Sequence, residues 1–169
     1  MSTAAAISVC EVPQASLLDA CRRQGHYTDC YTTRIPGTIS QAEYVEAFYT
    51  TALFKLERRL LRWLAAAPSS DDEARALARA ERNRFAAWQV EARSPDQLLL
   101  AAGRTKSWLM VRPQGGTTRL YFGSAVVPGR SRAGRSGLGP TFAALLGFHK
   151  LYSRALLRAA RRRLAKFHD

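Results

Sequence analysis

The chain has 169 residues, of which 47% are hydrophobic and 23% are charged. This length and composition suit one globular domain with an apolar core and exclude a chain that is disordered throughout. The net charge of +13 is uneven, because residues 98–169 hold 14 Lys and Arg against one acid, whereas residues 1–97 hold 12 side chains of each sign. A basic half is typical of a protein with an anionic partner, and it is equally typical of an arginine-rich composition.

The spacing of cysteine and histidine matches no common zinc site. Cys10, Cys21 and Cys30 include no CxxC pair, and the three histidines do not complete a ligand set. We therefore expect free thiols in a reducing compartment, and neither a metal nor another cofactor. The first residues lack the basic and apolar regions of a signal peptide, and no apolar run reaches the roughly 18–20 residues of a membrane span. The sequence thus predicts a cytoplasmic protein.

In the first half of the chain, the pattern predicts a weakly ordered segment, a strand and two helices. Residues 1–27 show little pattern beyond a short helix near 15–23. Residues 29–36 (DCYTTRIP) alternate as a strand that ends at a Pro-Gly pair. Two Ser-x-x-Glu capping boxes then begin helices over 40–67 and 70–88, with apolar residues at helical spacing.

The second half predicts a run of antiparallel strands followed by one long helix. Short Gly- and Pro-containing turns separate strands over residues 89–93, 97–102, 107–112 and 118–127. After a Gly/Ser/Arg-rich loop, residues 141–167 form an amphipathic, basic helix. This order predicts an α+β helix-grip fold, in which a curved antiparallel sheet wraps around a long C-terminal helix and two helices follow the first strand. The domain would cover residues 28–169.

Several stretches resemble a known group of sequences. They are DCYTTRIP, EAFYTTALFKLERRLLRWL, GRTKSWLMV, RLYFGSAVVP and LLGFHKLYSRALLRAARRRL, and together they span about residues 27–165. They resemble an uncharacterised bacterial family that is similar to domains of unknown function in the START/polyketide-cyclase-like (SRPBCC) superfamily. The resemblance implies a helix-grip fold with an internal cavity for an apolar ligand. It implies no established reaction.

His149 is the most informative titratable residue in the sequence. It lies on the core-facing stripe of the long helix, one turn before Tyr152. This pair could orient a ligand or transfer protons. The alternative is a buried histidine that only fixes packing, since no carboxylate or nucleophile is evident beside it in the sequence. The P-loop, GxGxxG, HExxH and GxSxG motifs do not occur.

The first functional hypothesis is a module that binds a small apolar or amphipathic molecule between the sheet and the C-terminal helix. Arg104 would hold an anionic group of this ligand, although Arg104 and Lys106 also suit a solvated sheet edge. The residues expected to contact the ligand are Arg104, Trp108, Met110, Leu120, Phe122, His149 and Tyr152. The aromatic members of this set are equally typical of a plain core.

Two other hypotheses stay open. One is a cyclase, dehydratase or hydrolase-type enzyme that uses His149 and Tyr152. The other is an accessory protein whose basic helix binds an anionic surface, such as a membrane. The residues expected to contact that surface are Lys150, Arg154, Arg158 and Arg162. The chain carries no motif that favours sequence-specific nucleic-acid binding, because charge alone supplies only salt-sensitive affinity.

Overall fold

The computed structural model describes residues 6–55, 70–128 and 140–168. Seven strands form one antiparallel sheet in the order β1-β2-β7-β6-β5-β4-β3. The strands are β1 (Ser8–Val9), β2 (Tyr27–Pro36), β3 (Arg84–Phe85), β4 (Trp88–Ser94), β5 (Gln97–Ala102), β6 (Thr105–Gln114) and β7 (Thr117–Val126). The helices are α1 (Asp19–Arg23), α2 (Gln41–Tyr49), α4 (Asp71–Ala78) and α5 (Pro140–His168).

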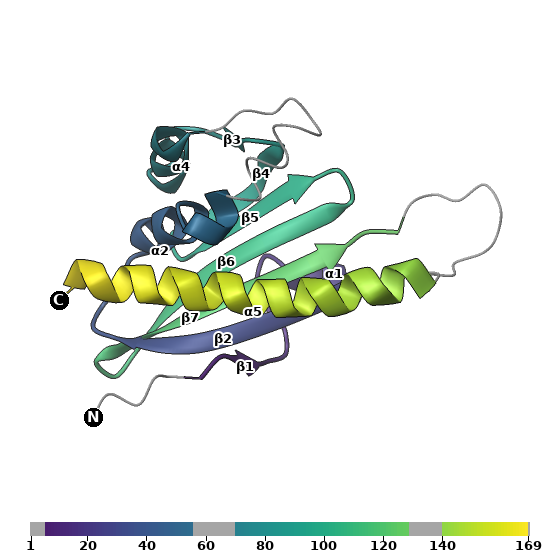
Figure 1. Ribbon diagram of the computed structural model, residues 1–169, viewed down its shortest axis with the longest axis horizontal. Coiled ribbons are helices and arrows are strands. Elements are labelled where there is room, and N and C mark those ends of the chain that lie inside the picture. The colour runs from purple at the N-terminus through teal and green to yellow at the C-terminus, as the bar shows by residue number, and fades with distance from the viewer. Residues whose placement is uncertain (1–5, 56–69, 129–139, 169) are drawn as a thin grey trace.

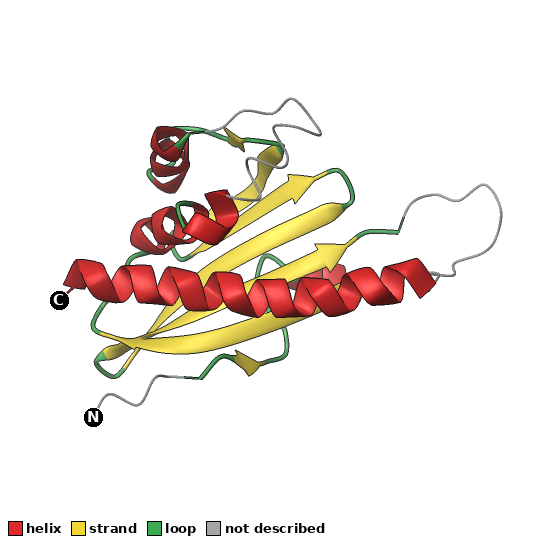
Figure 2. Cartoon of the chain, in the orientation of Figure 1, coloured by secondary structure: helices red, strands yellow, loops and turns green. Residues whose placement is uncertain are grey.

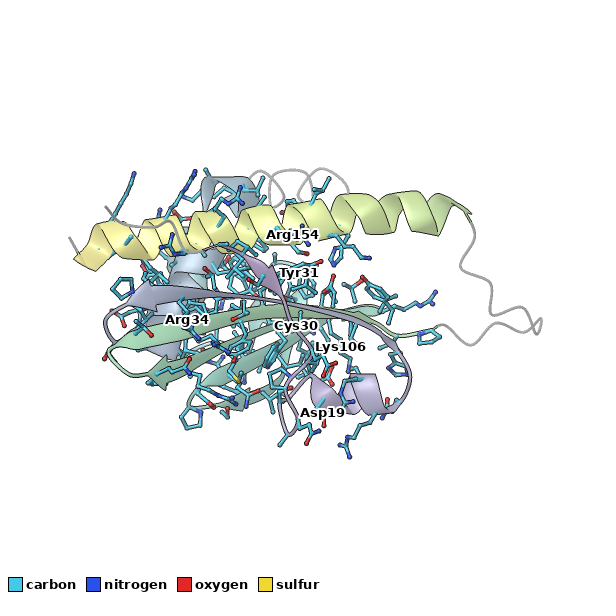
Figure 3. The ribbon with its side chains drawn as sticks, turned by 90° about the horizontal axis from the view of Figure 1, so that it is seen from below. Asp19, Cys30, Tyr31, Arg34, Lys106 and Arg154 are labelled. Carbon is cyan, nitrogen blue, oxygen red and sulfur yellow. The ribbon has the colours of Figure 1, made fainter. Side chains whose placement is uncertain are left out.

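The helices lie on both faces of the sheet. The long helix α5 runs across one face beside α2, and it packs against α2 and β2 (Figure 1). Seen along the sheet, α5 lies on one side and the short helix that carries Asp19, α1, lies on the other (Figure 3). The curved sheet with its long C-terminal helix confirms the predicted α+β helix-grip architecture (Figure 2).

Alternation along the strands divides the buried side chains into two clusters. On the α5 face, Leu120 and Phe122 of β7 join the large cluster that includes Leu156 and Leu157 of α5. On the α1 face, Tyr121 of β7 joins a smaller cluster built around the N-terminal segment, β5 and β6. Because neighbouring residues of a strand point to opposite faces, one ten-residue strand contributes to both layers.

The predicted strands are confirmed, with small differences at their ends. The structure adds β1 and β3, each of two residues, at the two edges of the sheet. Both β1 and α1 fall within residues 1–27, the segment for which the sequence predicts weak order. In this segment Leu18 and Cys21 are buried against the sheet. The predicted loop over 129–139 lies outside the described residues.

The helix predicted over 40–67 is wrong as one continuous element. Its capping box is present at Ser40, but α2 ends at Tyr49. The hydroxyl of Thr50 donates to the carbonyl of Glu46 at 2.7 Å, and Thr51 Oγ1 accepts from the backbone N–H of Phe54 at 3.2 Å. Threonine hydroxyls that bond the backbone compete with helical pairing, and here Thr51 caps a new helical turn over residues 52–55. Residues 56–69 lie outside the described part of the chain.

The second helix also ends earlier than predicted. Its capping box at Ser70 is present, but α4 stops at Ala78, and Ala80 adopts a left-handed backbone with φ of 62°. Phe85 and Trp88, predicted to lie on this helix, instead face each other in the β3–β4 pair. Phe85 is 1% exposed and packs in the large cluster, so burial against the sheet outweighs the local helical pattern.

Candidate functional site

A buried carboxylate joins β2, β7 and α5. Asp29 faces Ser124 directly in the β2–β7 register. Asp29 Oδ1 accepts two hydrogen bonds from Ser124, one from its hydroxyl at 2.6 Å and one from its backbone N–H at 3.1 Å. On α5, His149 Nε2 lies 2.7 Å from Ser124 Oγ and 3.4 Å from Asp29 Oδ2. The side chain of Asp29 is 8% exposed and that of His149 is 32% exposed, so solvent reaches the cluster from the histidine side.

The proton positions in this cluster follow from its connectivity. A serine hydroxyl carries one proton, and the 2.6 Å contact assigns it to Asp29. Ser124 Oγ then accepts a hydrogen bond from His149, which requires the proton of the imidazole to be on Nε2. This arrangement differs from a nucleophilic serine, whose proton points toward an unprotonated histidine nitrogen. The cluster is therefore organised around the carboxylate and is suited to binding or moving a proton through His149.

Two tyrosines extend the same face of β2 on either side of Asp29. The hydroxyl of Tyr27 lies 3.4 Å from Asp29 Oδ2 and donates toward it. Burial and the neighbouring Asp29 carboxylate raise the pKa of Tyr27 well above the ordinary value. The same causes raise the pKa of Tyr31 to about 12. Both phenols are therefore neutral hydrogen-bond donors at physiological pH.

These residues border a cleft of about 530 Å³ at the β1–β2 edge of the sheet. Its lining combines apolar, phenolic, thiol and charged side chains. The lining residues are Val9, Cys10, Glu11, Val12, Arg22, Tyr27, Thr28, Asp29, Cys30, Tyr31, Lys150 and Arg154. Figure 3 shows Arg154 on α5 above Tyr31, and the guanidinium carbon lies 5.6 Å from the centre of the Tyr31 ring. The volume falls within the range of about 300–1,000 Å³ that is typical of small-molecule sites.

The structure does not bring the seven predicted ligand-binding residues into one pocket. Trp108 is fully buried on the α1 face, where its Nε1 donates to Gln97 at 3.0 Å, and Met110 packs in the same cluster. Leu120 and Phe122 lie on the opposite face, within the large cluster under α5. The sheet thus separates two pairs that the prediction placed together.

The remaining predicted contacts are also dispersed. Arg104 follows β5 at an exposed hairpin, where its Nε donates to the carbonyl of Val127 at 2.9 Å. Tyr152 is half-buried against the large cluster. His149 contacts Asp29, which lines the cleft, whereas the described lining contains none of the seven predicted residues. Ligand contact by these residues stays a prediction.

Sequence reasoning identified His149 but missed its partners, Asp29 and Ser124. A signal for each was present in the alternation. Asp29 begins the same strand face as Tyr31, and Ser124 follows Phe122 on the face that meets the helix. A charged or hydroxyl side chain on an otherwise apolar face predicts a buried polar contact. The sequence does not show that Asp29 and Ser124 are partners, because they lie 95 residues apart and the register between their strands depends on the whole sheet.

Among the described residues, no three or more His, Cys, Asp and Glu side chains gather closely enough to hold a metal ion. The helices in that part of the chain include none that is both long and apolar enough to cross a membrane. The side chains described under residues 153–164 of α5 fill the space between this helix and the sheet. The described cleft lies at the sheet edge.

No protein-family model and no curated protein matches the chain. Among solved structures, the solution structure of CalU16 from Micromonospora echinospora is similar, with 12% identity and a TM-score of 0.41, covering 96% of this chain and 78% of that protein. The crystal structure of CalU16 gives 13% identity and a TM-score of 0.31 over 96% and 93% of the two chains. The conserved protein of unknown function EF2215 from Enterococcus faecalis gives 11% identity and a TM-score of 0.37, over 80% and 70%. These similarities assign neither a family nor an activity.

Proposed function

We propose that the protein binds a small molecule with an anionic group and an apolar or aromatic body in the cleft between the N-terminal segment, β2 and α5. The observation that carries the proposal is the 530 Å³ cleft, which has cations at its rim and the Asp29 cluster at its wall. The resemblance of the sequence to START/polyketide-cyclase-like proteins supports ligand binding, because such a fold holds ligands against its sheet and C-terminal helix. We place the ligand at the sheet edge because core side chains occupy the region under residues 153–164 of α5.

The anion would be held by Lys150 and Arg154. They lie four residues apart on α5, so they share one face of the helix, and both are exposed where they border the cleft. The third cation, Arg22, is already paired with Asp19 at 2.6 Å. Lys150 and Arg154 therefore have the capacity to bind a carboxylate, sulfonate or phosphate group.

The body of the ligand would lie against the phenol rings and the apolar side chains of the N-terminal segment. Tyr27 and Tyr31 each present a ring and a neutral hydroxyl, and Val9 and Val12 add aliphatic surface. The negative charge of Asp29 is stabilised by hydrogen bonds from the hydroxyl and the backbone N–H of Ser124. An anionic group would therefore lie at the α5 rim, away from this carboxylate.

The test uses the fluorescent aromatic sulfonate 1-anilinonaphthalene-8-sulfonate, which carries an anion on an apolar body. The double variant Lys150→Gln/Arg154→Gln removes two charges from the rim of the cleft. We expect it to weaken probe binding at least about tenfold, the effect of losing roughly 1.4 kcal/mol of charge-assisted contacts. The matched control Arg158→Gln/Arg162→Gln removes the same charge from exposed residues of the same helix outside the lining, and we expect a change below about twofold.

An equal loss in both double variants would overturn the cleft proposal. Combined with a steep decrease in binding as salt rises, that result would favour the anionic-surface alternative, in which Lys150, Arg154, Arg158 and Arg162 act together. Vesicles that contain phosphatidylserine would then be the appropriate probe. An unchanged affinity in both variants would show that the probe binds elsewhere on the protein.

A second candidate function is proton-transfer catalysis, favoured by the hydrogen bond of His149 with Ser124 at 2.7 Å and by the Asp29 carboxylate 3.4 Å from the same nitrogen. An imidazole held by a carboxylate and open to solvent on one side can exchange protons with a bound carbon acid. The test incubates the protein with 2-tetralone in deuterated water and follows deuterium incorporation by NMR. His149→Gln should abolish any protein-dependent exchange, whereas the surface variant Asp72→Asn should retain it. Exchange that is equal in both variants would exclude this role for His149.

A further inference from the structure

Cys10 and Cys30 face each other across the edge of the sheet. The β1–β2 register places Val9 opposite Tyr31, and the next residue along, Cys10, donates its backbone N–H to the carbonyl of Cys30 at 3.0 Å. Their sulfur atoms lie 2.9 Å apart. Opposed residues of antiparallel strands have Cα atoms about 4.5–5.5 Å apart, within the range of about 4.4–6.8 Å seen in disulfides. A bond of about 2.05 Å would require the sulfurs to approach by only about 0.9 Å.

The two thiols differ in accessibility and in acidity. Cys10 is half-buried and Cys30 is 1% exposed, and both belong to the wall of the cleft. The hydrogen bond with Cys30 lowers the pKa of Cys10, and the positive charge of Arg119 acts in the same direction. The same hydrogen bond, together with burial, raises the pKa of Cys30. Cys10 is thus the more accessible and the more acidic thiol of the pair, and the thiolate is the reactive form of cysteine.

We infer that Cys10 and Cys30 are a reactive dithiol that hydroperoxides oxidise reversibly to a disulfide in the wall of the cleft. The Cys10 thiolate attacks one oxygen of the hydroperoxide, so that an S–O bond forms and the O–O bond breaks. The other oxygen takes up the proton that the Cys10 thiol released on ionising and leaves as an alcohol or water. The Cys30 sulfur then attacks the sulfenic acid at Cys10, the S–S bond forms, and the hydroxyl leaves as water with the proton of Cys30. Two electrons pass from the thiols to the peroxide, and a dithiol such as dithiothreitol reverses the oxidation.

Cys21 provides an internal comparison. It is 2% exposed, packs in the same cluster as Cys30 and is not among the described residues that line the cleft. All three cysteines are free in the structure. Selective oxidation of Cys10 and Cys30 would therefore reflect their placement rather than the general reactivity of the chain's thiols. This inference does not depend on the proposed ligand.

The experiment treats the reduced full-length protein with hydrogen peroxide and follows intact mass and peptide maps. We expect a mass lower by two hydrogen atoms, a Cys10–Cys30 crosslinked peptide, and full recovery of the starting mass with dithiothreitol. The matched control Cys21→Ser should react in the same way and at a similar rate. Cys30→Ser should stop at a sulfenic acid on Cys10, which dimedone traps as a covalent adduct.

Three outcomes would overturn the inference. The first is a disulfide that includes Cys21 or joins two chains. The second is irreversible addition of oxygen to Cys10 in the wild-type protein without loss of two hydrogen atoms. The third is oxidation of Cys10 no faster than that of Cys21, measured in the folded state confirmed by circular dichroism. These oxidation measurements do not require a bound ligand, so they can succeed even if 1-anilinonaphthalene-8-sulfonate does not bind.

Discussion

Ser124 donates two hydrogen bonds to the same oxygen of Asp29, one from its hydroxyl at 2.6 Å and one from its backbone N–H at 3.1 Å. The two residues also face each other in the β2–β7 register. Because His149 of α5 contacts both of them, one cluster joins two central strands to the C-terminal helix. This polar contact fixes the orientation of α5 on the sheet together with the hydrogen bond from Arg161 Nε to the carbonyl of Arg34, since hydrogen bonds constrain the groups that they join.

The first prediction concerns the carboxylate. Asp29→Asn replaces one carboxylate oxygen with an NH2 group that cannot accept a hydrogen bond. If the remaining oxygen keeps the two Ser124 hydrogen bonds, the Tyr27 hydroxyl loses Oδ2 as an acceptor, and in the flipped orientation Ser124 loses both. We expect the free energy of unfolding to fall by about 1–3 kcal/mol, measured by urea denaturation. Asp72→Asn is the matched control, because the Asp72 side chain is 89% exposed, and it should change stability by less than about 0.5 kcal/mol. Equal effects of the two substitutions would contradict the role of Asp29.

The second prediction concerns the tautomer of His149. If the serine proton points to Asp29, the neutral imidazole must carry its proton on Nε2. Nitrogen-15 NMR of histidine-labelled protein should therefore show a protonated Nε2 and an unprotonated Nδ1 in the neutral ring. Ser124→Ala should weaken this preference. A ring that is protonated on Nδ1 in the wild-type protein would reverse the proton assignment and restore a nucleophilic role for Ser124.

The third prediction concerns Gly123, which stands opposite both Cys30 and Trp108 in the sheet. A Cβ atom at this position would lie 2.8 Å from the side chain of Leu18 and 2.9 Å from the carbonyl oxygen of Asp29. Because the carbonyl oxygen belongs to the paired strand β2 and cannot move aside readily, Gly123→Ala should displace the Leu18 side chain and disturb the β2–β7 pairing. We expect a loss of about 1–3 kcal/mol in the free energy of unfolding. Unchanged stability in urea would show that Leu18 does not pack tightly against β7.

The fourth prediction concerns alkaline pH. The neutral form of Tyr31 is favoured by folding, because burial and Asp29 raise its pKa to about 12. Its contribution to stability is thus complete below the ordinary phenol pKa of about 10 and is lost as pH rises from there through about 12. Stopped-flow pH jumps that record ultraviolet absorbance before unfolding should show one phenol with a midpoint near 12 that disappears in Tyr31→Phe. A midpoint for Tyr31 near 10 would contradict the assignment.

Local sequence signals determined most of the secondary structure. Alternation placed the strands, and the two capping boxes marked the starts of α2 and α4. These signals are readable because they depend on residues within a few positions of one another. The same signals predicted both helices to be longer than they are. The first helix ends where the hydroxyls of Thr50 and Thr51 bond to the backbone, and the second ends before Phe85, which is buried against the sheet. These contacts outweigh helical periodicity.

The sequence by itself determined the fold class, the basic C-terminal half and the position of His149 on the core-facing stripe of the long helix. Only the tertiary structure decided what surrounds that histidine. Strand register brings Asp29 to Ser124 across 95 residues, and the β1–β2 pairing brings Cys10 to Cys30. It also separates Trp108 from Phe122, because Phe122 pairs with Leu109, and Leu109 and Trp108 are neighbours on β6 that point to opposite faces. A shift of one residue in the strand register would turn every side chain of that strand to the opposite face of the sheet. The packing of the whole core therefore selects the register, rather than any local pattern.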